Sequence, residues 1–279
     1  MSDPRRAFEP ARGLSVVRFG EGGAAEGRDA VAVEEPLEVR LHDRPFAVVM
    51  RTPGADRELA AGFLLAEGIL ASADELGAVE HCRHPDHTDA HNVVNVFLMG
   101  EARERLEETL SARRNVAANT SCGMCGRVTI DAVRTRAQPI ERRSMIAGGI
   151  VPALVSALRR QQSVFDETGG IHGAALFTTD GRLVSAAEDV GRHNAVDKVV
   201  GRMLLDERLP LPGHVLLVSG RTSFEIVQKA WLAGIEILCA VSAPSSLAVE
   251  VAQEAGITLI GFARAAGFNI YSHPGRVVT

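Results

Sequence analysis

The stretch VLLVSGRTSFEIVQKAWLAGIEILCAVSAPSSLAVEVAQEAGI, residues 215–257, decides the fold of the second half of the chain. Two apolar runs in it are each followed by a pattern typical of an amphipathic helix. Gly234 and Gly256 stand where these helices should end, and Ser245 stands where the second should begin. The expected order is a strand at 215–219, a helix at 223–233, a strand at 235–241 and a helix at 245–256. Such alternation predicts parallel strands with helices packed on the sheet.

The flanking residues extend this domain in both directions. AALFTTDGRLVSAA, residues 174–187, is typical of a hairpin, because Asp180 and Gly181 separate two alternating apolar runs. Further helices are expected at 152–161 and 192–205, and further strands near Ile257 and Phe268. The sequence therefore predicts a three-layer α/β domain over residues 146–279, with a mixed, mostly parallel sheet.

The first half of the chain predicts a smaller α+β domain over residues 31–145. Its expected elements are strands at 31–41, 46–50 and 93–98, a helix capped by Asp56, and a charged helix at 103–114. Residues 1–30 are rich in glycine, alanine, arginine and glutamate without periodicity, and predict a mobile arm. The boundary between the two domains is expected near residues 135–150.

Composition excludes several classes of protein. With 279 residues, 46% hydrophobic and 23% charged, the chain is long enough for two globular domains. A net charge of -5 argues against a general nucleic-acid binder. No run approaches the roughly 18 apolar residues that span a membrane, and the N-terminus lacks an apolar signal core. Four cysteines in a chain of this length indicate thiols in a reducing cytoplasm rather than a disulfide scaffold.

Cys122-Gly123-Met124-Cys125 is the chemical centre of the sequence, and three interpretations compete. A thioredoxin-type dithiol would open a helix, but the β-branched residues after Gly126 do not favour one. A structural zinc site would need a second ligand group. Cys82 would supply that second group together with four nearby histidines, His81, His84, His87 and His91.

The third interpretation is a loop that carries a nucleophilic thiolate. We favour this interpretation, and it requires no bound metal. Glycine on both sides of the cysteine pair lets the backbone move between a sulfur donor and a sulfur acceptor. The thiolate is the attacking species, and a second cysteine resolves or protects the intermediate. Cys239 lies in an apolar strand pattern and is expected to be a small buried hydrophobe.

Polar motifs follow the expected strands of the second domain, where open α/β sheets bind ligands. Three of them, 188–194, 219–223 and 242–246, lead into helix N-termini, which favour anions such as phosphate. The candidate binding residues are His172, Asp189, Arg192, His193, Asn194, Lys198, Ser219, Arg221, Ser223 and Ser242. Together they predict a site of nucleotide size at one edge of the sheet.

Zinc nucleoside deaminases share this order of hairpin, helix, strand and helix. They place H-x-E at the start of the first core helix and P-C-x-x-C at the next. Here His193-Asn194-Ala195 lacks the glutamate, and residues 219–223 contain no cysteine. The sequence therefore argues against deaminase chemistry but not against a deaminase-like architecture.

Five motifs in the same order resemble the formate dehydrogenase accessory sulfurtransferase family. They are NTSCGMCG (119–126), FDETGGIHGAALF (165–177), AEDVGRHNAVDKVVG (187–201), SGRTSFEIVQKA (219–230) and FNIYSHPGR (268–276). The resemblance runs from about residue 51 to residue 276. Members of this family take sulfur from a cysteine desulfurase and deliver it to the bis(molybdopterin guanine dinucleotide) molybdenum cofactor that formate dehydrogenase needs.

The resemblance implies Cys122 as the persulfide-bearing residue, Cys125 as its partner and a deaminase-like core. It also implies a segment that contacts the cofactor, namely Gly261, Phe262, Ala263, Arg264, Ala265 and Ala266. The family often has a basic residue after Arg-Gly, which is absent here. A GDP-like fragment should bind, and so large a cofactor suits a homodimer. Two alternatives stay open, a cofactor-insertion chaperone that moves no sulfur and a zinc-stabilised binding module.

Overall fold

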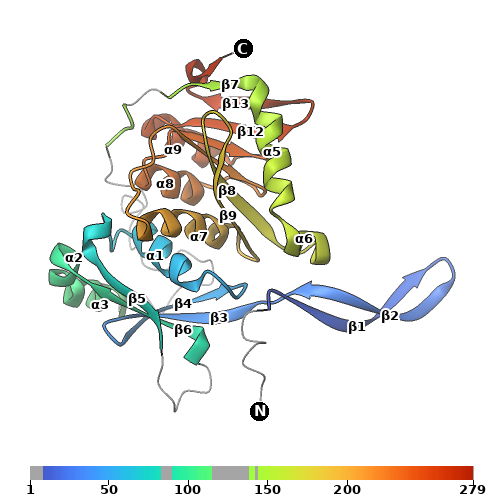
Figure 1. Cartoon of the computed structure of the whole chain (residues 1–279), viewed down its shortest axis with the longest axis horizontal. Helices are drawn as coiled ribbons and strands as arrows, with labels where there is room; N and C mark the ends of the chain where they lie inside the picture. The colour runs from blue at the N-terminus through green and yellow to red at the C-terminus, as the bar shows by residue number, and fades with distance from the viewer. Residues whose placement is uncertain (1–8, 83–89, 115–137, 142–143, 279) are drawn as a thin grey trace.

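The computed structural model describes residues 9–82, 90–114, 138–141 and 144–278 (Figure 1). Its largest sheet has six strands in the order β13-β12-β11-β10-β8-β9. Their bounds are β8 His172–Thr178, β9 Leu183–Asp189, β10 His214–Val218, β11 Ile237–Ala240, β12 Thr258–Arg264 and β13 Gly267–Ser272. β11 pairs in parallel with β10 and β12, and the other three pairings are antiparallel. The predicted mixed sheet is confirmed, but fewer of its strand pairings are parallel than the sequence predicts.

Helices cover both faces of this sheet, which confirms the three-layer α/β architecture (Figure 1). Leu216 and Val218 of β10 pack in one core, and Val215 and Leu217 pack in another, because successive side chains on a strand point to opposite faces. The first core lies under α7 Arg192–Leu205, α8 Phe224–Leu232 and α9 Ser246–Ala255. The second lies under α5 Val151–Arg160, which is followed by the short α6 Ser163–Thr168. The unbroken apolar run at residues 215–218 of β10 follows from burial on both faces.

A four-stranded sheet forms the first half of the chain, in the order β4-β3-β6-β5. Its strands are β3 Glu35–Leu41, β4 Arg44–Arg51, β5 Leu76–His81 and β6 Val93–Leu98. Its helices are α1 Asp56–Ala66, α2 Gly100–Glu104 and α3 Leu106–Arg114, so the charged helix expected at 103–114 is two short helices. The short elements are η2 Ala73–Glu75, η3 Ala90–Asn92, η4 Gly148–Ile150, η5 Pro274–Arg276, and the paired strands β7 Ile146–Ala147 and β14 Val277–Val278.

Asp56 does not cap α1, which corrects the expectation from the sequence. Ala55 holds the N-cap position in a left-handed conformation, with φ at 54°. The Asp56 carboxylate instead accepts hydrogen bonds from the Arg51 guanidinium at 2.9 and 3.0 Å. A buried guanidinium binds a carboxylate more strongly than two backbone amides at a helix end do, because the pair is bidentate and charged on both sides.

A long hairpin, β1 Ala11–Gly20 and β2 Gly23–Ala32, precedes both sheets and extends away from the body of the protein (Figure 1). The sequence predicts regular structure only from about residue 31, and this was wrong. The side chains of Val17 and Phe19 are 68% and 87% exposed. Because neither is buried, the segment lacks the alternation by which a half-buried strand is recognised.

The two halves of the chain meet where α1 crosses α7. A Cβ atom on Gly62 would lie 2.0 Å from the carbonyl oxygen of Asp197, and one on Gly201 would lie 1.9 Å from that of Glu58. The helices therefore pack backbone against backbone, and one apolar core runs through both halves. The predicted boundary between domains at 145 and 146 stays a prediction.

Candidate functional site

The candidate site lies at one edge of the six-stranded sheet, where β10 and β11 end and β8 begins. Ser219 and Gly173 exchange two hydrogen bonds there: the Ser219 amide donates to the Gly173 carbonyl, and the Gly173 amide donates to Ser219 Oγ, both at 2.9 Å. A Cβ atom on Gly220 would lie 3.2 Å from His172 Nδ1 and 3.6 Å from Arg192 Cβ. The structure thus brings together His172, Arg192 and Ser219, as the sequence predicts.

Backbone hydrogen bonds join the neighbouring loops at this edge. The Thr222 amide donates to the Ala243 carbonyl at 3.1 Å, and the Ser245 amide donates to the Thr222 carbonyl at 2.9 Å. The Phe262 amide donates to the Ser242 carbonyl at 3.1 Å. We call the joined segments the strand-end platform, residues 219–223, 242–245 and 261–262.

Two helices begin at the platform with no side-chain hydrogen bond at their N-caps, α7 after Gly191 and α8 after Ser223. The third, α9, is capped by Ser245, whose Oγ accepts a hydrogen bond from the Ala248 amide. Open N-terminal amides favour anions. Arg221 is exposed, and Arg192 Nε is buried without a hydrogen-bond partner among the described residues. The platform therefore offers positive charge to a ligand.

The two histidines of the site are neutral at physiological pH. Burial, and then the positive charges of Lys229 and Arg192, lower the pKa of His193 to about 3. Its Nε2 lies 3.1 Å from Ser223 Oγ, so these two predicted residues contact each other. A Glu225 carboxylate oxygen lies 3.2 Å from the same nitrogen.

His172 has a lowered pKa for a related reason, namely burial first and then the charges of Arg192 and Arg221. A neutral imidazole has one donor and one acceptor nitrogen. The positive charge of the site thus comes from arginine rather than histidine, and does not depend on pH near neutrality.

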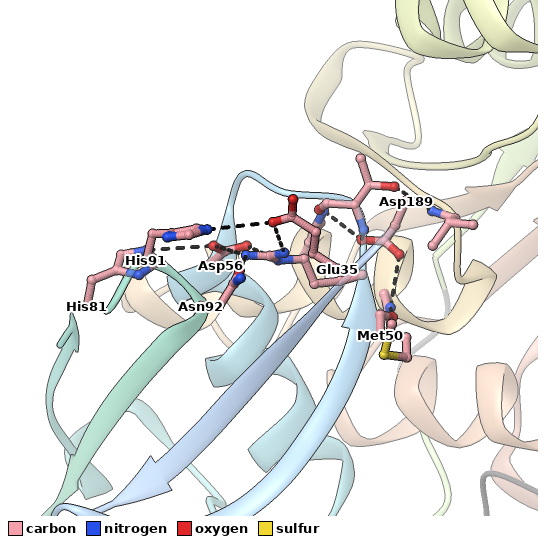
Figure 2. Close-up of polar contacts among 12 residues, drawn as sticks. Glu35, Met50, Asp56, His81, His91, Asn92 and Asp189 are labelled. Atoms are coloured by element: carbon pink, nitrogen blue, oxygen red, sulfur yellow. Dashed lines mark hydrogen bonds and ion pairs between the residues drawn. The ribbon is translucent and has the colours of Figure 1, made fainter. Parts of the chain in front are cut away.

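Three predicted binding residues, Asp189, Asn194 and Lys198, connect the end of β9 and the start of α7 to the first half of the chain, and Figure 2 shows Asp189 among its partners. Asp189 is fully buried, pairs with Lys198 Nζ at 2.7 Å and accepts hydrogen bonds from the Thr52 amide and Asn194 Nδ2. Lys198 Nζ also donates to the Thr52 carbonyl, and Asn194 Nδ2 donates to the Met50 carbonyl. These contacts place the three side chains in support of the site. No local sequence pattern predicts the role of Thr52, because its partner Asp189 lies 137 residues away in the chain.

A second network contains two of the four histidines considered for zinc, His81 and His91 (Figure 2). The fully buried Arg51 pairs with Asp56 and lies 3.6 Å from Glu35. His81 Nε2 is 3.8 Å from Asp56, and His91 Nε2 is 3.7 Å from Glu35. Across the described part of the chain, no group of three or more His, Cys, Asp or Glu residues is arranged for a metal ion. His84 and His87 lie outside that part.

The predicted cofactor segment 261–266 divides into two parts. Gly261 and Ala263 are buried, and Phe262 is 40% exposed in a left-handed conformation with φ at 53°. Arg264, Ala265 and Ala266 are exposed at the turn between β12 and β13. The first part belongs to the platform, whereas the second is a hairpin tip that presents one arginine.

Cys122 and Cys125 lie outside the residues that the structure describes. Cys239 is buried in β11, and burial raises its pKa to about 12, which confirms the expectation of a small core residue. Among the described helices, none has the length and apolar character needed to cross a membrane.

Comparison with known proteins gives consistent matches over almost the whole chain. Residues 32–278 match the model of the FdhD/NarQ family. A protein of Streptomyces avermitilis named sulfur carrier protein FdhD is 48% identical over 94% of each chain. A protein of the same name from Anaeromyxobacter dehalogenans is 47% identical over 98% of this chain and 96% of its own. A solved structure from Desulfotalea psychrophila, described as a formate dehydrogenase accessory protein, has a TM-score of 0.79, is 25% identical, and covers 97% of this chain and all of its own.

Proposed function

Because the chain belongs to the FdhD/NarQ family, we propose that it is a sulfur carrier that accepts sulfur as a persulfide on Cys122. The donor is a cysteine desulfurase, and the acceptor is the bis(molybdopterin guanine dinucleotide) molybdenum cofactor of formate dehydrogenase. The name of the similar Streptomyces and Anaeromyxobacter proteins, sulfur carrier protein, supports the sulfur chemistry. The name of the Desulfotalea structure supports formate dehydrogenase as the recipient.

The two cysteines together account for every bond that forms or breaks in the proposed sulfur transfer. The Cys122 thiolate attacks the outer sulfur of the donor's persulfide, which breaks the donor's S–S bond, forms a new one on Cys122 and releases the donor thiolate. Cys125 then attacks the inner sulfur of the Cys122 persulfide. A disulfide forms between the two residues, and the outer sulfur leaves as sulfide for the cofactor. The two thiols supply both electrons, so no further reductant takes part in delivery.

The observation that carries the acceptor side of the proposal is the strand-end platform. Arg192 and Arg221 lie beside the open N-termini of α7 and α8. A bis-guanine dinucleotide carries several phosphates, which this combination of guanidinium groups and helix ends suits. GDP, a fragment of the cofactor, should bind there with micromolar-range affinity, about -8 kcal/mol. A homodimer in the cytoplasm remains part of the proposal.

Mass spectrometry tests the sulfur step. After incubation with a cysteine desulfurase and cysteine, the peptide that contains Cys122 should gain the mass of one sulfur atom. Cys122→Ala should abolish that gain, while the matched control Cys82→Ala should keep it. Cys82 follows the end of β5, where its amide donates to the Val93 carbonyl, and is not part of the C-x-x-C pair. Sulfur uptake by Cys122→Ala at the rate of the unaltered protein would contradict the assignment.

A cofactor-insertion chaperone is the second candidate, because a positively charged platform would serve cofactor binding whether or not the protein also moves sulfur. The two functions differ in a host that contains only the Cys122→Ala protein. Full formate dehydrogenase activity in that host would favour the chaperone, whereas loss of activity with cofactor binding retained would favour the carrier.

A further inference from the structure

The edge of the six-stranded sheet opposite to the strand-end platform contains two buried polar atoms without a partner. β10 begins at His214 and Glu236 directly precedes β11, whereas the platform follows the ends of these two strands. His214 Nε2 and Glu236 Oε1 are both buried, and neither has a hydrogen-bond partner within the described structure. Buried polar groups are nearly always hydrogen-bonded, so two such atoms on neighbouring strands point to a ligand.

The register of the strands places His214 and Glu236 side by side. Val215 and Ile237, the residues that follow them, pair in parallel and both pack in the core under α5. Because successive side chains on a strand point to opposite faces, His214 and Glu236 both point to the other face, toward α7, α8 and α9. Neighbouring strands lie about 4.8 Å apart, so the two side chains start close enough to share one small ligand.

The hydrogen bond that His214 makes leaves its second ring nitrogen as an electron-pair donor. Nδ1 lies 2.8 Å from the Pro212 carbonyl oxygen. A carbonyl oxygen can only accept, so Nδ1 carries the hydrogen, and in the neutral ring Nε2 has a lone pair. A histidine that binds a metal almost always donates its other ring N–H to a carbonyl, a carboxylate or water. His214 is thus oriented as metal ligands are.

Glu236 contributes a carboxylate that lacks a cation. The residue is fully buried, and its Oε2 accepts a hydrogen bond from the Ser144 amide at 2.6 Å. Within the described ranges, it forms no ion pair with a lysine, an arginine or a histidine. A carboxylate in the interior loses its hydration, and buried charges are therefore paired or bound to a metal. The group that is missing beside Glu236 is positively charged.

We propose that His214 and Glu236 bind a divalent transition-metal ion of the zinc type at this edge of the sheet. Imidazole nitrogen and carboxylate oxygen are both ordinary ligands of zinc. The ion supplies the positive charge that Glu236 lacks and accepts the lone pair of His214 Nε2, so one ligand accounts for both unpartnered atoms. This site is separate from the cysteine pair and from the histidine network of Figure 2.

Ser144 is the third group of the proposed site. Its amide bonds to Glu236, and its Oγ would lie 4.0 Å from a Cβ atom on Gly213, the neighbour of His214. The Ser144 hydroxyl and water complete the shell of an ion that prefers four ligands. His214 and Ser144 are each half-buried, which leaves a path for the ion from the solvent.

The ion would act on the segment that contains Ser144. This segment connects residues 115–137, which include the cysteine pair, to β7. At its start, Trp231 Nε1 donates to the Gln138 carbonyl at 2.8 Å, and further on the Ser144 amide bonds to Glu236. A metal ion that holds Glu236 and Ser144 together therefore strengthens the attachment of the chain that follows the cysteine pair.

Zinc alone is the probe that tests the site. It is added to the full chain with Cys122→Ala and Cys125→Ala, so that the cysteine pair does not compete for the ion. Equilibrium dialysis followed by elemental analysis measures the number of bound ions and their affinity. The protein should bind zinc, and the affinity should depend on His214 and Glu236.

Glu236→Gln removes the charge but keeps the size of the side chain and an acceptor for the Ser144 amide. It should weaken zinc binding at least tenfold, and His214→Phe should do the same. Glu250→Gln is the matched control, because Glu250 is an exposed glutamate on α9 and should leave the affinity unchanged. Zinc should also slow hydrogen exchange of the Ser144 amide, and this effect should disappear in the Glu236→Gln protein.

Three outcomes would overturn the proposal. One is the absence of zinc binding, and another is an equal affinity for zinc in the Glu236→Gln and Glu250→Gln proteins. The third is zinc binding that His214→Phe does not weaken, which would place the ion elsewhere. If the protein binds no zinc and Glu236→Gln stabilises it, a proton or a water molecule satisfies the carboxylate instead.

Discussion

Gly201 on α7 lies so close to Gly62 on α1 that a Cβ atom on Gly201 would be 2.6 Å from the Gly62 nitrogen. Real Cβ atoms do not approach backbone this closely, so any side chain at either position forces the helices apart. The crossing also sets the separation of the two sheets, because α1 belongs to the first half of the chain and α7 to the second. Two residues without side chains thus hold the halves together.

Gly201→Ala should therefore destabilise the protein by about 3 kcal/mol or more, beyond the usual cost of an overpacked core, because backbone rather than side-chain atoms must move. Gly149→Ala is the matched control, since nothing lies within 4 Å of its added Cβ. Urea denaturation of both variants measures the difference. Equal midpoints for the two would show that the helices shift apart at little cost.

Lys198→Met should destabilise the fold by about 3–5 kcal/mol, because it leaves the Asp189 carboxylate buried without a counter-charge. Adding Asp189→Asn to the same protein should restore part of the loss. Arg202→Met on the same helix is the control, because the Arg202 guanidinium that pairs with Asp206 and Glu58 is itself exposed, and ion pairs at the surface are worth less than about 1 kcal/mol. Denaturant unfolding at pH 7 compares the three proteins.

Acid should weaken the protein through His193. Its pKa in the folded state is about 3, below the ordinary value of 6.5, so the unfolded chain binds the proton first as the pH falls. The stability that neutral His193 contributes is complete above pH 6.5 and is lost progressively toward pH 3. Between pH 7 and 5.5 this loss is about 1 kcal/mol. His193→Gln should flatten the curve by that amount in denaturant titrations. An unchanged slope would show that the pKa of His193 is the same in the folded and the unfolded protein.

Arg221→Ala should separate the two halves of the proposed reaction. Loading of Cys122 needs only the sulfur donor, so it should proceed normally, whereas delivery needs the cofactor on the platform and should fail. Arg182→Ala is the control, because Arg182 is an exposed arginine at the opposite end of β8, in its turn to β9. Persulfide mass spectrometry measures loading, and formate dehydrogenase activity in the host measures delivery. A folded Arg221→Ala protein that has lost both steps would contradict an independent role for the platform.

Periodicity alone predicts much of the second half of the chain. The helix expected at 192–205 is α7 to the residue, and Ser245 and Gly256 begin and end α9 as expected. These features are local, because caps and apolar spacing act within a few residues. The hairpin at residues 11–32 is not predictable in this way. Both of its faces are mostly exposed, so its sequence is not held to the alternation of apolar and polar residues that marks a half-buried strand.

The candidate site is predictable in part for the same reason. The positions of His172, Arg192 and Arg221 at strand ends follow from topology, which places such ends along one edge of a sheet. The supporting role of Asp189 and Lys198 does not follow, since it depends on Thr52 from the other half of the chain.

The hydrogen bonds that join the loops of the strand-end platform to one another run between main-chain groups of Thr222, Ala243, Ser245, Ser242 and Phe262. Every residue type except proline carries the same amide and carbonyl, so these links between the loops do not depend on the side chains of those five residues. Recognition at this edge is therefore open to change without a change of scaffold. A different set of side chains at Arg192 and Arg221 would give related proteins, or a protein engineer, another ligand on the same loops.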